Sequence, residues 1–414
     1  MKHYLSEFPD QKKMLNLYPK LEILQVNGHI HTPYSFSAFT DVASIFEMAQ
    51  KENVAVVGIN DFNVADGYEA FHNESLKSGV FPLFNIEFIG LLEDAQRNGI
   101  RINDPDNPGR CYFSGKGLNY PFKLNDHLYR KLSLVIEKSQ GQMNEMIGKV
   151  NDWFAKIDCD INLNYIDIKN RFAKELVRER HIARAIKFAV FEKRRNDEEK
   201  VALLTTIFNG KAPKSAMSDL PGLENEIRSN LLKAGGVAFV KEDESTFLKL
   251  DEVIEIILNA GGIPCYPVLL DDKNGNYTEF EQNPDRLWQE LVKRNIGCIE
   301  LIPGRNDAAE LEKFVTFFAQ KGFAILFGTE HNSPDLIPLT CDTRGKKALS
   351  SEMQRISYEG CCIVAAHQYL QAKGAMGFVD NQSYPNLEAR DSFVKLGNAV
   401  IHYFRNNIRV GQAN

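Results

Sequence analysis

Hydrophobic residues in this chain form short continuous runs that alternate with longer stretches of helical spacing. The short runs predict buried strands over residues 21–26, 54–59, 80–84, 263–269, 297–302 and 323–327. The stretches between them predict amphipathic helices, among them residues 66–78, 251–260, 285–294 and 308–321. Because strands that are joined through helices run parallel, this order predicts an α/β protein with a parallel sheet.

The strand pattern disappears in the middle of the chain. From residue 125 to residue 233 only helical periodicity remains, and we interpret this part as a helical insertion domain. The flanking parts, residues 1–124 and 234–414, then form one barrel-like body. Its last part is a helical extension, with clear periodicity over residues 363–370 and 393–404.

Polar residues that can bind a metal follow four of the predicted strands. Side chains two apart on a strand point to the same face, so the two histidines after the first strand can reach one point. Carboxylates and histidines at the carboxyl ends of strands that alternate with helices are typical of a barrel active site. The candidates are His29, His31, Asp61, Glu87, Glu330 and His331.

Composition narrows the class of protein. The chain has 414 residues, of which 43% are hydrophobic and 25% charged, as in ordinary globular proteins. A net charge of −6 argues against a general polyanion binder, although residues 169–214 are locally basic. No apolar run approaches the roughly 18 residues that span a bilayer, and residues 1–20 do not resemble a signal peptide. We therefore expect a cytoplasmic protein without a membrane partner.

The motifs occur in the order of a known family. A His-x-His motif, an acid after the third strand, an Ala-Gly-Gly-Ile-Pro strand, a Gly-Cys-Ile-Glu strand and a final Gly-Thr-Glu-His-Asn resemble the PHP (polymerase and histidinol phosphatase) family. The chain is most similar to single-chain phosphoesterases whose helical insertion carries an Arg-Pro-His-Ile-Ala-Arg-Ala helix. Residues 178–185 read Arg-Glu-Arg-His-Ile-Ala-Arg-Ala. The resemblance implies a distorted, TIM-like (β/α)7 barrel that hydrolyses phosphate esters with up to three zinc, manganese or iron ions.

Residue by residue, the resemblance implies one well-formed metal position. His29, His31, Glu87 and Glu330 match its four ligands, with Glu330 where the family usually has aspartate. Side chains that are poor ligands stand at other motif positions of the family: Asn27, Phe62, Tyr112, Tyr266 and Asn332. We therefore expect one divalent metal per chain (zinc, manganese or iron), and a second only if Asp61, His331 or a tyrosinate contributes.

Further site residues are expected around this metal. Asp61 is the candidate general base, and His331 is a candidate catalytic residue or shifted ligand. Cations near the barrel mouth would bind the phosphate in place of the missing metals. The candidates for that role are Arg110, Lys116, Arg184 and Arg305. His181 is a candidate to bind substrate or to act as an acid.

Three functional hypotheses remain open from the sequence. The first is a metal-dependent hydrolase of a small phosphorylated compound, a nucleotide or a sugar phosphate, with nucleic acid excluded beyond short oligonucleotides. The second is a degenerate homologue that binds a metal and a ligand without turnover. The third is a lyase or isomerase that acts on an unphosphorylated substrate. The sequence leaves the oligomeric state open.

Overall fold

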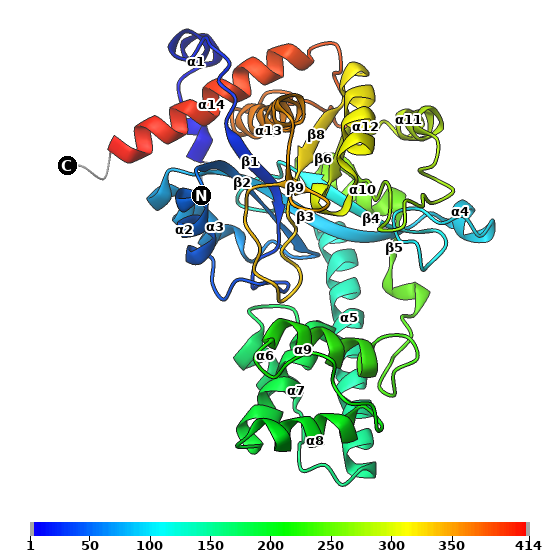
Figure 1. The fold of residues 1–414 in the computed structure, drawn as a ribbon. Coiled ribbons are helices and arrows are strands. Elements are labelled where there is room, and N and C mark those ends of the chain that lie inside the picture. The colour runs from blue at the N-terminus through cyan, green and yellow to red at the C-terminus, as the bar shows by residue number, and fades with distance from the viewer. Residues whose placement is uncertain (1–3, 411–414) are drawn as a thin grey trace.

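The computed structural model describes residues 4–410 and contains a nearly closed barrel with a helical arm below it (Figure 1). The barrel sheet has the strand order β1-β2-β3-β4-β6-β7-β8, and the short β5 pairs with β3. A bridge between Ile30 and Glu330 brings the end of β1 against the end of β8. The strands are β1 (Gln25–Ile30), β2 (Val54–Phe62), β3 (Phe81–Leu91), β4 (Arg110–Lys116), β5 (Leu248–Lys249), β6 (Ile263–Pro267), β7 (Cys298–Leu301) and β8 (Ala324–Phe327).

β4 and β1 show two of the differences from the sequence prediction. β4 was not predicted, and it runs antiparallel to both β3 and β6. Its polar residues Ser114 and Lys116 are fully buried, so a strand that turns polar groups inward has no hydrophobic signature. β1 begins at Gln25, four residues later than predicted, because Leu21 and Ile23 lie on the surface.

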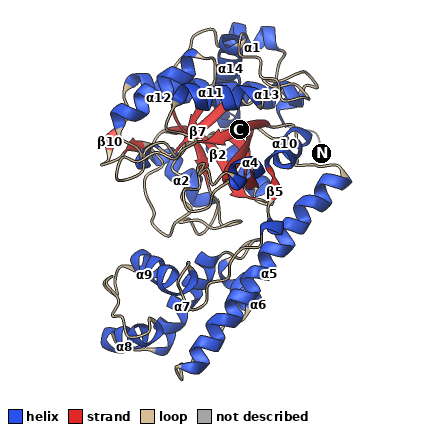
Figure 2. Cartoon of the chain, turned by 90° about the vertical axis from the view of Figure 1, so that its right-hand side faces the viewer, coloured by secondary structure: helices blue, strands red, loops and turns tan. Residues whose placement is uncertain are grey.

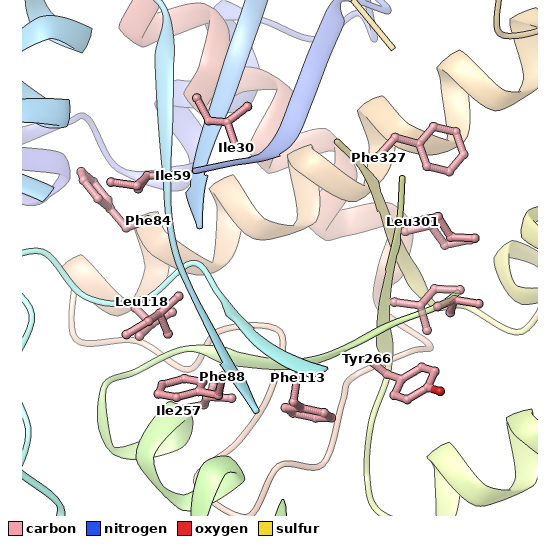
Figure 3. Close-up of a cluster of buried hydrophobic side chains, with 14 of the residues drawn as sticks. Ile30, Ile59, Phe84, Phe88, Phe113, Leu118, Ile257, Tyr266, Leu301 and Phe327 are labelled. Carbon is pink, nitrogen blue, oxygen red and sulfur yellow. The ribbon is translucent and has the colours of Figure 1, made fainter. Parts of the chain in front are cut away.

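One face of the sheet is covered by helices that follow the strands. These are α2 (Ala43–Lys51), α3 (Tyr68–Ser78), α10 (Leu250–Asn259), α11 (Pro284–Lys293) and α12 (Ala308–Gln320). Figure 3 shows part of the core between them, in which Phe88 lies with Ile257 of α10 and Phe84 lies beside Ile59. Burial of such side chains contributes roughly 1.5–3 kcal/mol each. The helices therefore hold the strands in place from outside.

The other face of the sheet is filled from one end by α13 (Ser351–Ala372), which α14 (Arg390–Val410) covers. The α13 backbone lies so close to β8 that a Cβ at Gly360 would be 1.9 Å from the Ile325 carbonyl oxygen. Strand residues in this second core, such as Leu83 and Cys298, come from the first halves of their strands. The opposite end of the barrel, at the carboxyl ends of the strands, is left for polar side chains.

The insertion is helical throughout and has a hydrophobic core of its own. Its first helix also reaches into the barrel, because Leu128 packs in the barrel core whereas Met146 and Phe154 pack in the insertion core. Figure 2 shows this helix, α5, running from the barrel along the other insertion helices. The insertion helices are α5 (Asp126–Lys156), α6 (Tyr165–Phe172), α7 (Glu179–Lys193), α8 (Asp197–Ile207), α9 (Leu220–Ile227) and the π-helical turn η2 (Arg228–Leu232).

The remaining elements are short. They are η1 (Tyr4–Glu7), α1 (Gln11–Leu17), α4 (Glu93–Arg97), η3 (Glu244–Thr246), η4 (Pro303–Arg305), β9 (Asp342–Thr343) and β10 (Lys347–Ala348). Across residues 4–410, every helix is too short or too polar to cross a membrane.

Candidate metal centre and its cavities

Four side chains converge at the open end of the barrel. One potential ligand atom from each of His29, His31, Glu87 and Glu330 lies within 4.8 Å of those of the other three. The Nε2 atom of His31 is 3.3 Å from His29 Nε2 and 3.3 Å from Glu87 Oε2. Two ligands placed tetrahedrally at about 2.0–2.1 Å from one zinc ion would be about 3.3 Å apart. The donor set and its spacing therefore fit one divalent cation, and we call these residues the ligand group.

Backbone contacts between β1 and the segment after β8 hold two of these ligands together. His31 N donates to Glu330 O at 2.7 Å, and Glu330 N donates to His29 O at 2.9 Å. Glu330 and His331 both have positive φ, 66° and 54°, which is uncommon for residues other than glycine. These hydrogen bonds stabilise that conformation, which turns the Glu330 side chain toward the histidines.

A buried carboxylate orients His29. Glu300, at the end of β7, accepts from His29 Nδ1 at 2.7 Å and from Lys116 Nζ at 2.5 Å. Burial would raise the pKa of Glu300, but Lys116 and His29 outweigh it and hold the pKa well below its usual value. Burial also lowers the pKa of His29. A neutral His29 that donates from Nδ1 to a charged Glu300 presents its unprotonated Nε2 to the ligand group.

A second buried carboxylate supports His31 through a serine. Ser35 Oγ lies 3.1 Å from His31 Nδ1 and donates to Asp61 Oδ1 at 2.6 Å. The other Asp61 oxygen accepts from the Thr32 hydroxyl, and burial raises the pKa of Asp61. Asp61 thus acts on His31 through Ser35, with both of its oxygens engaged. Its role as general base stays a prediction, and the observed contacts fit a positioning role.

Two cavities border the ligand group. The first has a volume of about 160 Å³ and lies in the barrel, where Arg305 and Glu300 join three of the ligands in its wall. The second, of about 100 Å³, lies between the start of α7 and the barrel and reaches His31 and Glu87. Tyr112 and Asn332 line both cavities. A ligand held by a metal at this point could therefore extend into the barrel or under the insertion.

Arginines of the insertion line the second cavity. Among residues 4–410, neither Arg178 nor Arg180 forms an ion pair with a carboxylate. The Arg178 guanidinium lies 4.1 Å above the ring of Phe62, and Arg180 donates to the Asn225 side chain. Burial and the neighbouring Arg228 lower the pKa of Arg180 to about 10, so it remains charged at neutral pH. This cavity therefore has a positive charge that no carboxylate fully balances.

The start of α7 adds to this positive charge. Arg178 is its N-cap residue. Two backbone hydrogen bonds connect the preceding segment to the barrel: Lys174 N donates to Pro33 O at 3.3 Å, and Leu176 N donates to Tyr34 O at 3.1 Å. A helix N-terminus carries a partial positive charge and free N–H groups, both of which favour anions. The insertion thus presents a second source of positive charge near the ligand group.

Two residues of α7 for which a role at the substrate was predicted have other partners in the structure, and those roles stay predictions. His181 is 1% exposed and uses Nδ1 to accept from Arg178 N at 3.0 Å, so it caps the helix instead of facing a substrate. Arg184 pairs with Glu224 at 3.3 Å and lies against Phe36. The helix turns Arg178 and Arg180 toward the cavity in place of these two residues.

The other predicted cations have different surroundings. Lys116 is fully buried between Glu300 and Asn60, so its observed contacts are with protein groups, and a contact with substrate stays a prediction. Arg110 pairs with two carboxylates and lines a neighbouring groove, away from the ligand group. Arg305 lines the barrel cavity and forms an ion pair with Glu330. Of the five candidates for substrate binding, Arg305 alone contacts a member of the ligand group directly within the described part of the chain.

The remaining candidates lie outside the ligand group. Both ring nitrogens of His331 are engaged, Nδ1 with Thr329 Oγ1 and Nε2 with Ile337 O, each at 2.8 Å. The Tyr266 hydroxyl donates to Glu281 at 2.7 Å, and burial raises its pKa well above the usual value. A second metal position that uses these residues would require them to break these contacts.

Sequence reasoning missed four residues of this site. Glu300 was visible as an acid near the end of a predicted strand, in the Gly-Cys-Ile-Glu motif, but received no role. Arg178 and Arg180 lie within the insertion motif, next to the residues that were chosen. Arg228 lies in a separate turn and has no local signal that would have identified it.

Comparisons with known proteins support the fold. No family model matches the sequence, and no curated protein sequence matches it. A solved structure named as a metal-dependent phosphoesterase, from Bifidobacterium adolescentis, aligns with a TM-score of 0.52 at 14% identity, covering 81% of this chain and 96% of the other.

A second solved structure, an amidohydrolase from Chromobacterium violaceum with bound sulfate and no metal, aligns with a TM-score of 0.50 at 14% identity. That alignment covers 80% of this chain and 96% of the other. At these identities the likeness shows the fold. The predicted α/β fold with a distorted, TIM-like barrel is confirmed.

Proposed function

We propose that this protein is a metal-dependent hydrolase of small phosphate esters. The observation that carries the proposal is the ligand group, two histidines and two glutamates within 4.8 Å, beside a cavity lined by Arg178 and Arg180, which have no carboxylate partner among residues 4–410. A metal site next to surplus positive charge suits a phosphorylated ligand. The names of the two structural neighbours, a phosphoesterase and an amidohydrolase, are consistent with hydrolysis.

The metal would be held by His29, His31, Glu87 and Glu330. Such a divalent ion supplies Lewis-acid chemistry, since it polarises a phosphoryl oxygen and lowers the pKa of water from about 15.7 toward about 7. We expect one ion per chain and leave zinc, manganese and iron as alternatives.

The chain's own cations would bind and orient the phosphate. Arg178 and Arg180 approach from the insertion, and Arg305 approaches from the barrel. Guanidinium groups match phosphate oxygens in two-point hydrogen bonds, which fix the orientation of the group as well as its position. The insertion also covers this side of the mouth, which limits water around the phosphate and strengthens these electrostatic contacts.

A non-catalytic homologue is the second candidate function. Its support is that Tyr266 and Phe62 occupy motif positions without offering a ligand, and that Asp61 has both oxygens engaged. This candidate predicts metal and phosphate binding without product release. Both candidate functions therefore predict metal and phosphate binding, and only the hydrolase predicts turnover.

The test is hydrolysis of a panel of nucleotides and sugar phosphates by full-length protein purified without chelator and loaded with zinc, manganese or iron. We expect phosphate release from at least one ester that is lost in Glu87→Gln. Folding of that variant should be confirmed by circular dichroism. Binding of phosphate without release from any ester would support the non-catalytic candidate, and absence of both would contradict the proposal.

A further inference from the structure

A third cavity adjoins the second one and continues into the space between barrel and insertion. It has a volume of about 150 Å³ and shares Phe62, Tyr112, Arg178, Glu179 and Arg228 with the cavity between α7 and the barrel. Tyr112, on β4, lines all three cavities. The third cavity, which we call the groove, is therefore an extension of the space that begins at the ligand group.

The walls of the groove come from both parts of the molecule. Ile89 of β3 lies on the barrel side, and Val135 and Met143 of α5 lie on the insertion side. Because α5 packs in the barrel core through Leu128 and in the insertion core through Met146, it fixes these walls relative to each other.

The groove differs in charge from the cavity between α7 and the barrel. Arg228 and Lys233 share Glu179 as their partner. Arg110 is paired with Asp104 and Glu242. These three cations thus face three carboxylates in total, whereas Arg178, at the entrance of the groove, has no carboxylate partner among residues 4–410. An anion is favoured at the entrance, and an apolar or neutral polar group is favoured beyond it.

From this arrangement we propose that the groove binds the alcohol part of the substrate, and that the substrates are phosphate monoesters of an elongated alcohol with an apolar or aromatic segment. The phosphate would lie at the ligand group and Arg178. The alcohol would pass Tyr112 and Phe62 and end against Val135 and Met143. This inference rests on the proposed function, because it assumes that a phosphate is bound at the ligand group.

The size of the space supports an elongated ligand. Sites for small molecules commonly measure about 300–1,000 Å³. The barrel cavity alone, at about 160 Å³, is well below that range, whereas the three adjoining cavities taken together reach it. A compact ester would leave the apolar wall of the groove in contact with water.

The experiment compares three phosphonates, which cannot be hydrolysed at the phosphorus–carbon bond, by calorimetric titration of full-length, metal-loaded protein. Methylphosphonate tests the phosphate position alone. The 4-phenylbutyl compound adds an apolar segment, and the 4-carboxybutyl compound adds a second anion. We expect the phenylbutyl compound to bind at least tenfold more tightly than methylphosphonate, and the carboxybutyl compound to gain no such advantage.

A blocking variant locates the effect. Ser139 of α5 lines the groove, so Ser139→Trp should fill it. The ratio of the affinity for the phenylbutyl compound to that for methylphosphonate, which we call the preference, should then fall close to one, while methylphosphonate affinity is retained. Ser133 lies on the same helix but lines a different cleft, of about 640 Å³, so Ser133→Trp is a matched control that should keep the preference. Ser139→Ala should also keep it. If Ser139→Trp does not fold, Val135→Trp blocks the same wall.

Several results would overturn the inference. Equal binding of methyl and phenylbutyl compounds by the unmodified protein would do so, as would tighter binding of the carboxybutyl compound than of the phenylbutyl compound. An unchanged preference in a folded blocking variant would also contradict it. If no phosphonate binds at all, the proposed function fails and this inference fails with it. If methylphosphonate binds without any preference for the longer compound, this inference alone is wrong.

Discussion

The barrel side and the insertion side of the cavity are built in opposite ways. On the barrel side, the ligands are held by buried partners, His29 by Glu300 and His31 by Ser35, and Glu300 is neutralised by Lys116. On the insertion side, Arg178 and Arg180 contact aromatic rings and an amide but no carboxylate of the described residues. The polar groups on the barrel side are hydrogen-bonded to one another, whereas the insertion side keeps positive charge that is not neutralised.

This difference matches what each side would bind. A metal requires ligands that stay within tenths of an ångström of fixed positions, so their ring orientation is determined by further hydrogen bonds. An anion requires positive charge that is not already neutralised, and stacking on an aromatic ring orients a guanidinium without cancelling its charge. We therefore expect mutations on the barrel side to change stability and metal affinity, and mutations on the insertion side to change phosphate affinity.

The largest expected effect is on the barrel side. Lys116→Met leaves Glu300 charged and buried without its main partner, and breaking a buried pair in this way costs about 3–5 kcal/mol. We expect a loss of that size in the free energy of unfolding measured by urea denaturation. The double variant Lys116→Met/Glu300→Gln should lose less, because it removes both charges. Equal losses in the single and double variants would show that the charge of Glu300 is unimportant. The surface pair Lys131–Glu252 offers the control Lys131→Met.

Metal binding should also depend on residues of the barrel side. We expect elemental analysis to find about one divalent ion per chain in the unmodified protein and almost none in His29→Ala. Glu300→Gln should keep the ligand group and weaken metal affinity by about 10–100-fold, the usual effect of losing a partner that orients a ligand. Three tightly held ions per chain would show that replacement ligands exist and that the ligand group is not the whole site.

Phosphate affinity should separate two arginines of one helix. We expect Arg178→Ala to weaken phosphate binding by the metal-loaded protein about tenfold, or about 1.4 kcal/mol, because it removes a cation from the cavity. Arg184→Ala should leave phosphate affinity unchanged, since Glu224 keeps Lys187 as a partner at 2.7 Å. Calorimetry measures the affinities, and melting temperatures check the folds. The reverse order of effects would restore the role that the sequence predicted for Arg184.

The smallest expected effect is a pH dependence on the insertion side. Burial, with Arg184 and Arg178, lowers the pKa of His181 well below its ordinary value. As pH falls through about 6.5 the unfolded chain takes up the proton first, so stability is full above that pH and is lost below it. Between pH 7 and pH 6 this loss is about 0.7 kcal/mol for one histidine. His181→Asn should reduce the pH dependence of the unfolding free energy by that amount, and an unchanged pH profile would show that His181 titrates normally.

Much of the barrel and its ligand group was predictable from local patterns. Buried parallel strands have continuous apolar runs, and ligands that follow such strands share one end of the sheet whatever the details of packing. The strand ends supplied six candidates, and the resemblance to the PHP family selected His29, His31, Glu87 and Glu330 from them as one group. Helical periodicity likewise predicted a helical insertion over residues 125–233, and those domain bounds stay a prediction.

Only the tertiary structure decided which other polar residues belong to the site. β4 escaped prediction because its inward residues are polar, and their burial depends on Glu300, which is 184 positions away from Lys116 in the chain. The sequence also could not tell which face of α7 points to the cavity. That orientation follows from long-range contacts, the backbone bonds to Pro33 and Tyr34 and the packing of His181 on Phe36. Periodicity determines which residues share a face, and only the folded chain determines what that face meets.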